Sequence, residues 1–143
     1  MKPLLETPAD NHAHTYRHLG YLAVYDAVLN SEYAFVVYEE FDRDSSAWRM
    51  KITSTHTEGT TFEPAMVEKK ALEAEAKRKP YVRWGFYCEP TISDPRQIEY
   101  RLYQEHGKPT AIELFVRLRT YEHNADTPQS LHFPWPSGKP TAS

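Results

Sequence analysis

The sequence predicts an α+β fold, in which a helix, a two-stranded hairpin, a second helix and a three-stranded antiparallel meander form a twisted sheet packed by helices. Three observations lead to this fold class. Segments between residues 81 and 119 alternate apolar and polar residues with period two, as strands with one buried face do. The segment after Pro64 is rich in alanine and charged residues, which favours a helix. The aromatic content of 13% is typical of a sheet-rich core.

Length and composition predict one soluble domain. The 143-residue chain is 40% hydrophobic and 26% charged, which is ordinary for one globular domain with one core. We expect a flexible arm at residues 1–9, a single α+β domain at 10–121 and a flexible proline-rich tail at 122–143. Since no apolar run is long enough to span a bilayer and residues 1–10 lack signal-peptide features, we expect a cytoplasmic protein without a membrane partner.

Residues 10–30 carry an ambiguous pattern that we interpret as the first helix. Its buried stripe would follow the spacing i, i+3, i+4, i+7 and consist of Tyr21, Val24, Tyr25 and Val28. A strand would instead place Asp26 among Leu22, Val24 and Val28 on one apolar face, where burial of a carboxylate is costly. The helix keeps Asp26 away from the stripe, so we expect a helix here.

The next segment predicts a β-hairpin. Residues 33–41 are rich in β-branched and aromatic side chains and too few for an independent helix, which indicates a buried strand. A turn-forming run at residues 42–46 follows, after which Trp48, Met50 and Ile52 alternate with polar residues. The threonine-rich stretch at residues 53–61 has no apolar pattern and is interpreted as a loop.

The second helix should run from Pro64 to about residue 78. Proline suits the first helical position, and Pro80 ends the helix. Its apolar stripe is narrow and made of small side chains, Val67, Ala71 and Ala74, which suits close approach to a sheet.

Three strands then form the predicted meander, joined by a loop at residues 90–95 and a turn at residues 106–109. The apolar faces of the three strands consist of Val82, Trp84, Phe86 and Cys88, of Ile98, Tyr100 and Leu102, and of Ile112, Leu114, Val116 and Leu118. The burial of Cys88 predicts an unreactive thiol. In element order alone, this outline is similar to that of the cone-shaped NTF2-like domains and, more loosely, to small dimeric secretion chaperones.

The opposite face of the meander is the best candidate for a binding surface, because it is both basic and aromatic. The candidate residues are Arg83, Arg101, Arg117, Arg119, Tyr81, Tyr87, Tyr103 and Phe115. Arginine and tyrosine are enriched at protein interfaces, and the same residue types bind single-stranded nucleic acid by stacking on bases and neutralising phosphates. Glu99 and Glu113 lie on this face as well, so a solvated face with cross-strand ion pairs stays open.

The sequence contains no motif for catalysis, cofactor binding or nucleotide binding, so we assign no catalytic residue and no cofactor. The densest histidine group contains His14 and His18, which would share a face of the first helix and are weak candidates for a metal ion. Two ligands do not form a closed metal site, so we expect no metal.

These observations predict a non-enzymatic binding or regulatory protein, a homodimer that contacts a macromolecule, most readily a protein, through the Arg/Tyr-rich face or edge. One alternative is a nucleic-acid-binding protein that uses the same face. Another is a small NTF2-like enzyme or ligand-binding domain with its ligand near Tyr25, Trp84 or Tyr100.

Overall fold

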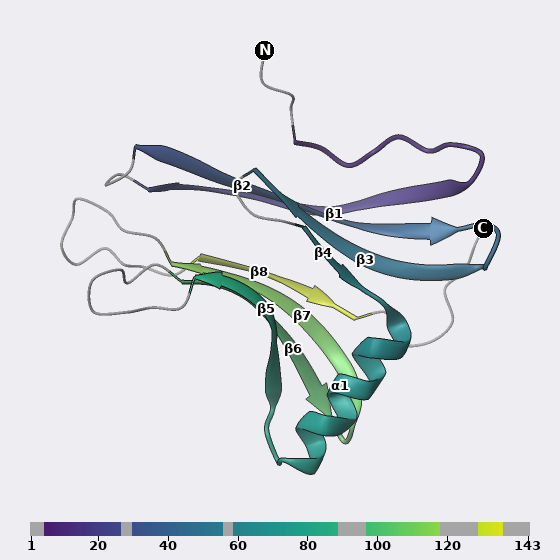
Figure 1. The fold of residues 1–143 in the computed structure, drawn as a ribbon, viewed down its shortest axis with the longest axis vertical. Helices are drawn as coiled ribbons and strands as arrows, with labels where there is room; N and C mark the ends of the chain where they lie inside the picture. Colours follow the sequence, from purple (N-terminus) through teal and green to yellow (C-terminus); the bar gives the residue numbers. More distant parts are fainter. Residues whose placement is uncertain (1–4, 27–29, 56–58, 89–96, 118–128, 136–143) are drawn as a thin grey trace.

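Two four-stranded antiparallel sheets face each other across a shared core (Figure 1). The computed structural model describes residues 5–26, 30–55, 59–88, 97–117 and 129–135, and for residues 85–88 the backbone only. Within these ranges the chain forms eight strands and one helix.

The first sheet comes from the amino-terminal half of the chain. Its strands, in spatial order, are β1 (His14–Asp26), β2 (Ser31–Asp42), β3 (Ala47–Ser54) and β4 (Thr60–Phe62). Each strand pairs with its neighbour in the sequence, so this sheet is a meander.

The second sheet repeats this arrangement with the rest of the chain. Its strands, in spatial order, are β5 (Tyr81–Cys88), β6 (Gln97–Glu105), β7 (Lys108–Arg117) and β8 (Gln129–Pro134). Again each strand pairs with its neighbour in the sequence, so hairpin connections set the order of both sheets.

The core lies between the two sheets and takes side chains from both. Its fully buried members include Phe35, Val37, Met50, Ile52 and Phe62 of the first sheet and Ile98, Tyr100, Leu102, Ile112, Leu114 and Val116 of the second. Phe62 packs against Tyr100 in an edge-to-face contact with ring centroids 5.8 Å apart, which joins the sheets directly.

The helix α1 (Pro64–Ala76) connects the two sheets and begins at the predicted residue. Pro64 lies in the first turn, where its missing N–H removes no intrahelical hydrogen bond. Val67, Ala71 and Ala74 are its buried residues, as the apolar stripe predicts, and Val67 belongs to the core between the sheets. The helix contacts β5, β6 and β7, and it lies across one end of the second sheet in Figure 1.

The predicted fold class is wrong. The protein is mostly β, with two four-stranded sheets and one short helix, instead of an α+β arrangement of helix, hairpin, helix and three-stranded meander. Strands do form in the hairpin and meander segments, but they belong to two separate sheets. The outline of the NTF2-like domains therefore does not apply to this chain.

The segment interpreted as the first helix is the strand β1. A β-bulge between His18 and Gly20 interrupts its period-two alternation, which is why the sequence shows a helix-like spacing instead. Tyr21 and Tyr25 of the supposed stripe are half exposed, whereas Val24 is buried on the opposite face. Asp26 is fully buried beside the core at the end of the strand, and it has a polar or electrostatic interaction there.

Two further strands lie in segments that showed no strand pattern. The three-residue β4 overlaps the end of the supposed threonine-rich loop and ends at Phe62. The strand β8 forms within the segment expected to be a flexible tail and pairs with β7, with Phe133 opposite Ile112. Because β8 is the last strand of its sheet, Pro134 at its end removes no ladder hydrogen bond from a central strand.

The edge strands β1 and β8 approach each other closely at Gly20. A Cβ atom at this position would lie 3.0 Å from Cε1 and Cζ of the Phe133 ring, which is closer than normal packing allows. Glycine therefore lets the first sheet fold over the edge of the second, and this closes one side of the core.

Candidate ligand-binding cavity

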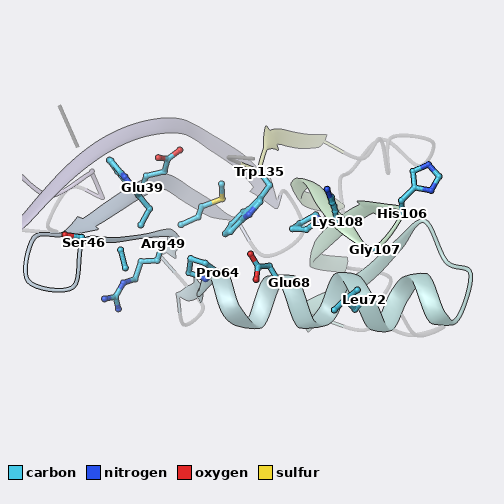
Figure 2. A pocket seen from close by; sticks show the side chains of 14 residues that line it. Glu39, Ser46, Arg49, Pro64, Glu68, Leu72, His106, Gly107, Lys108 and Trp135 are labelled. Atoms are coloured by element: carbon cyan, nitrogen blue, oxygen red, sulfur yellow. The ribbon is translucent and has the colours of Figure 1, made fainter. Parts of the chain in front are cut away.

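A cavity of about 820 Å³ lies at one end of the space between the sheets. Its lining comes from the end of β2 and the start of β3, from α1, from the turn between β6 and β7, and from Trp135 after β8. Figure 2 shows Trp135 above the helix, with Pro64, Glu68 and Leu72 along the side of α1 beneath it. These three residues are four positions apart, so they form one ridge of the helix.

The lining is mainly apolar and includes two indole rings. The apolar residues are Ala47, Trp48, Met50, Pro64, Leu72, Pro109 and Trp135. Of these, Met50 is buried within the core and Leu72 is 62% exposed, so the cavity extends from the core to the protein surface. The backbone N–H of Trp135 donates a hydrogen bond to the carbonyl of Thr110 at 2.9 Å, which fixes the backbone of this wall to β7.

An ion pair between a buried carboxylate and an exposed arginine lies beside the inner wall. Glu39 is 5% exposed and accepts a hydrogen bond from Arg17 Nη2 at 2.6 Å, across the pairing of β1 with β2. The guanidinium carbon of Arg17 lies 6.0 Å from the centroid of the Trp48 ring, within cation–π range. The positive charge of Arg17 therefore compensates the negative charge of the buried Glu39 carboxylate.

Trp48 lines the cavity, but its Nε1 atom is inaccessible to water and does not open into it. Its ring packs against Phe41 with centroids 5.0 Å apart, which sets the position of the indole. The Nε1 atom is buried, and it donates a hydrogen bond to no residue within the described parts of the chain. A buried N–H without an acceptor costs roughly 1–3 kcal/mol, so such groups call for an explanation.

The other charged residues at the cavity are compensated or exposed. Arg49 forms ion pairs with Glu40 at 3.3 Å and Glu63 at 3.1 Å, and Figure 2 shows its guanidinium directed away from Trp135. Glu68 and Lys108, one of each sign, are exposed to solvent. The cavity therefore offers no excess of either charge.

The residues of the predicted basic and aromatic face come together on the second sheet. Pairing places six of them on the face opposite the core, namely Tyr81, Arg83, Arg101, Tyr103, Phe115 and Arg117. Arg119 lies outside the described residues, as does the side chain of Tyr87.

The centre of this face is a network around Glu99, which is only 2% exposed. The carboxylate of Glu99 forms ion pairs with Arg101 Nε and, at 3.1 Å, with Arg83 Nε. Gln97 Nε2 donates a further hydrogen bond to it at 3.0 Å. The Arg101 guanidinium also lies over the Phe115 ring, with its carbon 4.2 Å from the centroid. Much of the positive charge of this face is thus matched from within the protein.

Glu113 extends the network at its other end. It forms an ion pair with Arg101 Nη1 at 3.6 Å and accepts a hydrogen bond from the Tyr103 hydroxyl at 2.9 Å. Burial raises the pKa of Tyr103, and this hydrogen bond raises it further. Burial alone would lower the pKa of Arg101, but its hydrogen bonds with Glu99 and Tyr103 outweigh this effect and raise it.

The weak metal candidates, His14 and His18, lie on a strand instead of a shared helix face. Four residues along a strand separate their Cα atoms by about 13 Å, too far for two imidazoles to approach one ion readily. The ring of His14 lies 6.1 Å from that of Tyr16, and His18 Nδ1 is 2.8 Å from the Thr7 hydroxyl. Within the described residues, no group of three or more His, Cys, Asp or Glu side chains is arranged to hold a metal ion.

Sequence reasoning missed the cavity because its lining comes from segments far apart in the chain. The residues named for an enclosed ligand, Tyr25, Trp84 and Tyr100, do not line it. Tyr100 is fully buried, Trp84 packs on Phe62 at 5.2 Å, and Tyr25 is half exposed. The available signal was Leu72, an apolar residue of the predicted helix that lies off its buried stripe.

Comparison with protein-family models, characterised proteins and solved structures finds no match to this chain. In the part of the chain that the structure describes, no helix is long and apolar enough to cross a membrane. The functional argument therefore depends on the geometry of the two sheets and the cavity.

Proposed function

We propose that this protein binds a small apolar molecule in the cavity between the two sheets and α1. The cavity itself carries the proposal, because a volume of about 820 Å³ lies within the range of small-molecule sites, roughly 300–1,000 Å³. Such sites are typically apolar with a few placed polar groups, and a lining with two indoles beside Glu68 and Lys108 matches this description.

Burial of the ligand's apolar surface would supply most of the binding free energy. Each Å² of apolar surface removed from water contributes about 25 cal/mol. The thioether of Met50 is polarizable, and the indole of Trp135 is flat. Most of the lining residues belong to paired strands and a packed helix, which hold them in place. A preformed site of this kind loses little conformational entropy on binding.

The Arg/Tyr-rich face supports a function less strongly than the cavity does. Glu99 and Glu113 already pair with Arg101, and Glu99 pairs with Arg83. A nucleic acid or an acidic protein would have to compete with the buried Glu99 and the partly buried Glu113 for the same guanidinium groups. A structural role in the second sheet explains this face without a partner.

Titration with Nile red, a neutral apolar dye that brightens in apolar sites, tests the proposal. We expect saturable one-to-one binding that Leu72→Trp weakens by about tenfold or more, because extra bulk on the α1 ridge would reduce the space in the cavity. The matched control is Met66→Trp, since Met66 is a 45% exposed apolar residue of the same helix and does not line the cavity.

Met66→Trp should retain the affinity of the unmodified protein to within about twofold. Thermal unfolding of both variants would check that the fold is retained. The proposal fails if the unmodified protein shows no saturable binding, or if both substitutions weaken the dye equally.

A further inference from the structure

We infer that a groove between α1 and the outer edge of β5 binds an extended acidic peptide of a partner protein, which adds to the second sheet as a further strand. This inference goes beyond the proposed function, because the groove shares no lining residue with the cavity. Three features of the groove support it: the backbone of β5, the helix beside that strand and the positive charge of both.

The strand β5 lies at the edge of its sheet and pairs with β6 alone among the described strands. The N–H of Gln104 donates a hydrogen bond to the carbonyl of Pro80 at 3.0 Å, so this carbonyl points toward β6. Backbone groups of successive strand residues point to opposite edges. Val82 therefore also faces β6, whereas the N–H and C=O groups of Tyr81 point away from it. Such an edge is a template on which another chain can pair.

A groove of about 560 Å³ runs between this edge and α1. Its strand wall includes Tyr81, Val82 and Arg83 in succession. Since successive side chains point to opposite faces of a sheet, consecutive residues line one groove along the edge of the strand. Its helix wall includes Lys70 and Lys77, which lie two turns apart on one side of α1. Addition of an extended peptide to an exposed sheet edge is a recurring mode of peptide recognition.

The charge of the groove favours an acidic partner. Its charged residues are one acidic residue, Glu73, and four cationic residues, Lys70, Lys77, Lys79 and Arg83. Lys70 pairs with Glu73 at 3.8 Å. Arg83 pairs with the buried Glu99 at 3.1 Å. Lys77 and Lys79 are exposed, and neither forms an ion pair in the described parts of the chain, so both remain available to carboxylates of a ligand.

The turn that carries these two lysines is held in place by hydrogen bonds. The N–H of Lys79 donates to the carbonyl of Ala74 at 2.9 Å, and Gln104 Nε2 donates to the carbonyl of Lys79 at 2.8 Å. Between the lysines, Arg78 has a φ of 55°, a conformation that favours glycine after a helix. Three successive cations therefore lie on a turn that is fixed before binding, which reduces the entropy lost when a partner binds.

The backbone of β5 favours a peptide over a nucleic acid or a second copy of this chain. The outward C=O group of Tyr81 needs a donor, and phosphodiester groups offer acceptors only, whereas a peptide offers donors and acceptors. Pairing of two β5 edges from two copies would bring Lys79 and Arg83 of each copy close to the same cations of the other. Like charges on neighbouring strands destabilise their pairing.

Calorimetric titration with an acetylated and amidated heptapeptide of alternating glutamate and valine tests the inference. We expect saturable one-to-one binding, and no saturable binding when lysine replaces glutamate in the peptide. Lys77→Glu should weaken binding of the acidic peptide by about fivefold or more, because it reverses one exposed charge of the groove. Lys77→Arg keeps this charge and should retain the affinity to within about twofold.

Lys69→Glu is the matched control, because Lys69 is an exposed lysine of α1 that does not line the groove. The substitution changes the net charge of the protein by the same amount as Lys77→Glu. At physiological ionic strength we expect it to retain the affinity to within about twofold. Thermal unfolding of the variants would check that the fold is retained.

Hydrogen exchange of the backbone amides tests the strand addition itself on the unmodified protein. We expect a saturating amount of the acidic peptide to slow exchange of the Tyr81 amide by about tenfold or more, because this amide gains a hydrogen bond. The Val82 amide already faces β6, so its exchange rate should change by less than about twofold. A peptide held by charge alone would leave both rates unchanged.

Several outcomes would overturn the inference. Absence of saturable binding would leave the cations as protection of the edge against other strands. Equal weakening by Lys69→Glu and Lys77→Glu, or an unchanged exchange rate of the Tyr81 amide, would exclude strand addition in the groove. Tighter binding of single-stranded oligothymidylate than of the peptide would make the partner a nucleic acid. The proposed function is tested separately, because Nile red binding depends on the cavity.

Discussion

Phe62→Ala should destabilise the protein by about 3–5 kcal/mol, which would leave a domain of this size close to unfolding. Phe62 is fully buried, and its ring lies 5.2 Å from Trp84 and 5.8 Å from Tyr100, which belong to the opposite sheet. Truncation would leave a void between the sheets and remove both aromatic contacts. Urea unfolding, followed by tryptophan fluorescence and circular dichroism, would measure the loss.

Thr61→Ala is the matched control, because Thr61 is the adjacent residue of β4 and pairs with Lys51 on the outer face. We expect it to change the free energy of unfolding by about 0.5 kcal/mol or less. Should Phe62→Ala itself be too unstable to purify, Phe62→Leu should show a smaller loss of the same origin. A cost below about 1 kcal/mol for Phe62→Ala would mean that the sheets do not share one core at this point.

Arg101→Met should destabilise the protein by about 3 kcal/mol, because Glu99 would stay buried with part of its charge uncompensated. Methionine keeps much of the apolar stem but removes the guanidinium that lies over the Phe115 and Tyr81 rings, so the loss would come from the ion pair and from these cation–π contacts. Arg83 and Gln97 would still contact Glu99, which keeps the expected loss at the lower end for a broken buried pair.

Two comparisons isolate this effect. Arg83→Met removes the other arginine from the same carboxylate, and since the Arg83 side chain is 49% exposed, we expect a cost of about 1 kcal/mol or less. In a Glu99→Gln background, Arg101→Met should cost at least about 1 kcal/mol less than in the unmodified protein. Equal costs of Arg101→Met in both backgrounds would contradict the network around Glu99. If Arg101→Met instead left the free energy of unfolding unchanged and removed a salt-sensitive binding of nucleic acid or protein, the face would be a binding surface.

The strands that the sequence predicts correctly are those whose own residues alternate between the core and the outer face. Period-two alternation marks β3, β6 and β7 because each strand has one face toward the core. The β1 segment was misinterpreted because its bulge at residue 19 breaks that alternation, and because β2 provides a long pairing partner that overrides local helix preference. The short β4 and the proline-flanked β8 depend on pairing with neighbours, which no local pattern records.

The candidate site was less predictable than the fold for a related reason. The sequence grouped Arg101, Arg117 and Tyr81 correctly on one face, since strand alternation determines which residues share a side. It did not show that Glu99 would be buried among the arginines. The cavity lies where α1 and the β6–β7 turn meet the end of the first sheet, so Trp48 and Trp135 come together only through the arrangement of both sheets.

A crystal structure of the complex with a brominated Nile red derivative would test the central claim most directly, because anomalous scattering locates the bromine independently of the protein density. The account predicts a bromine peak within the cavity, with the dye beside Met50 and Trp135. A bromine peak on the outer face of the second sheet beside Arg101 and Tyr81, or an empty cavity in crystals saturated with the probe, would contradict it.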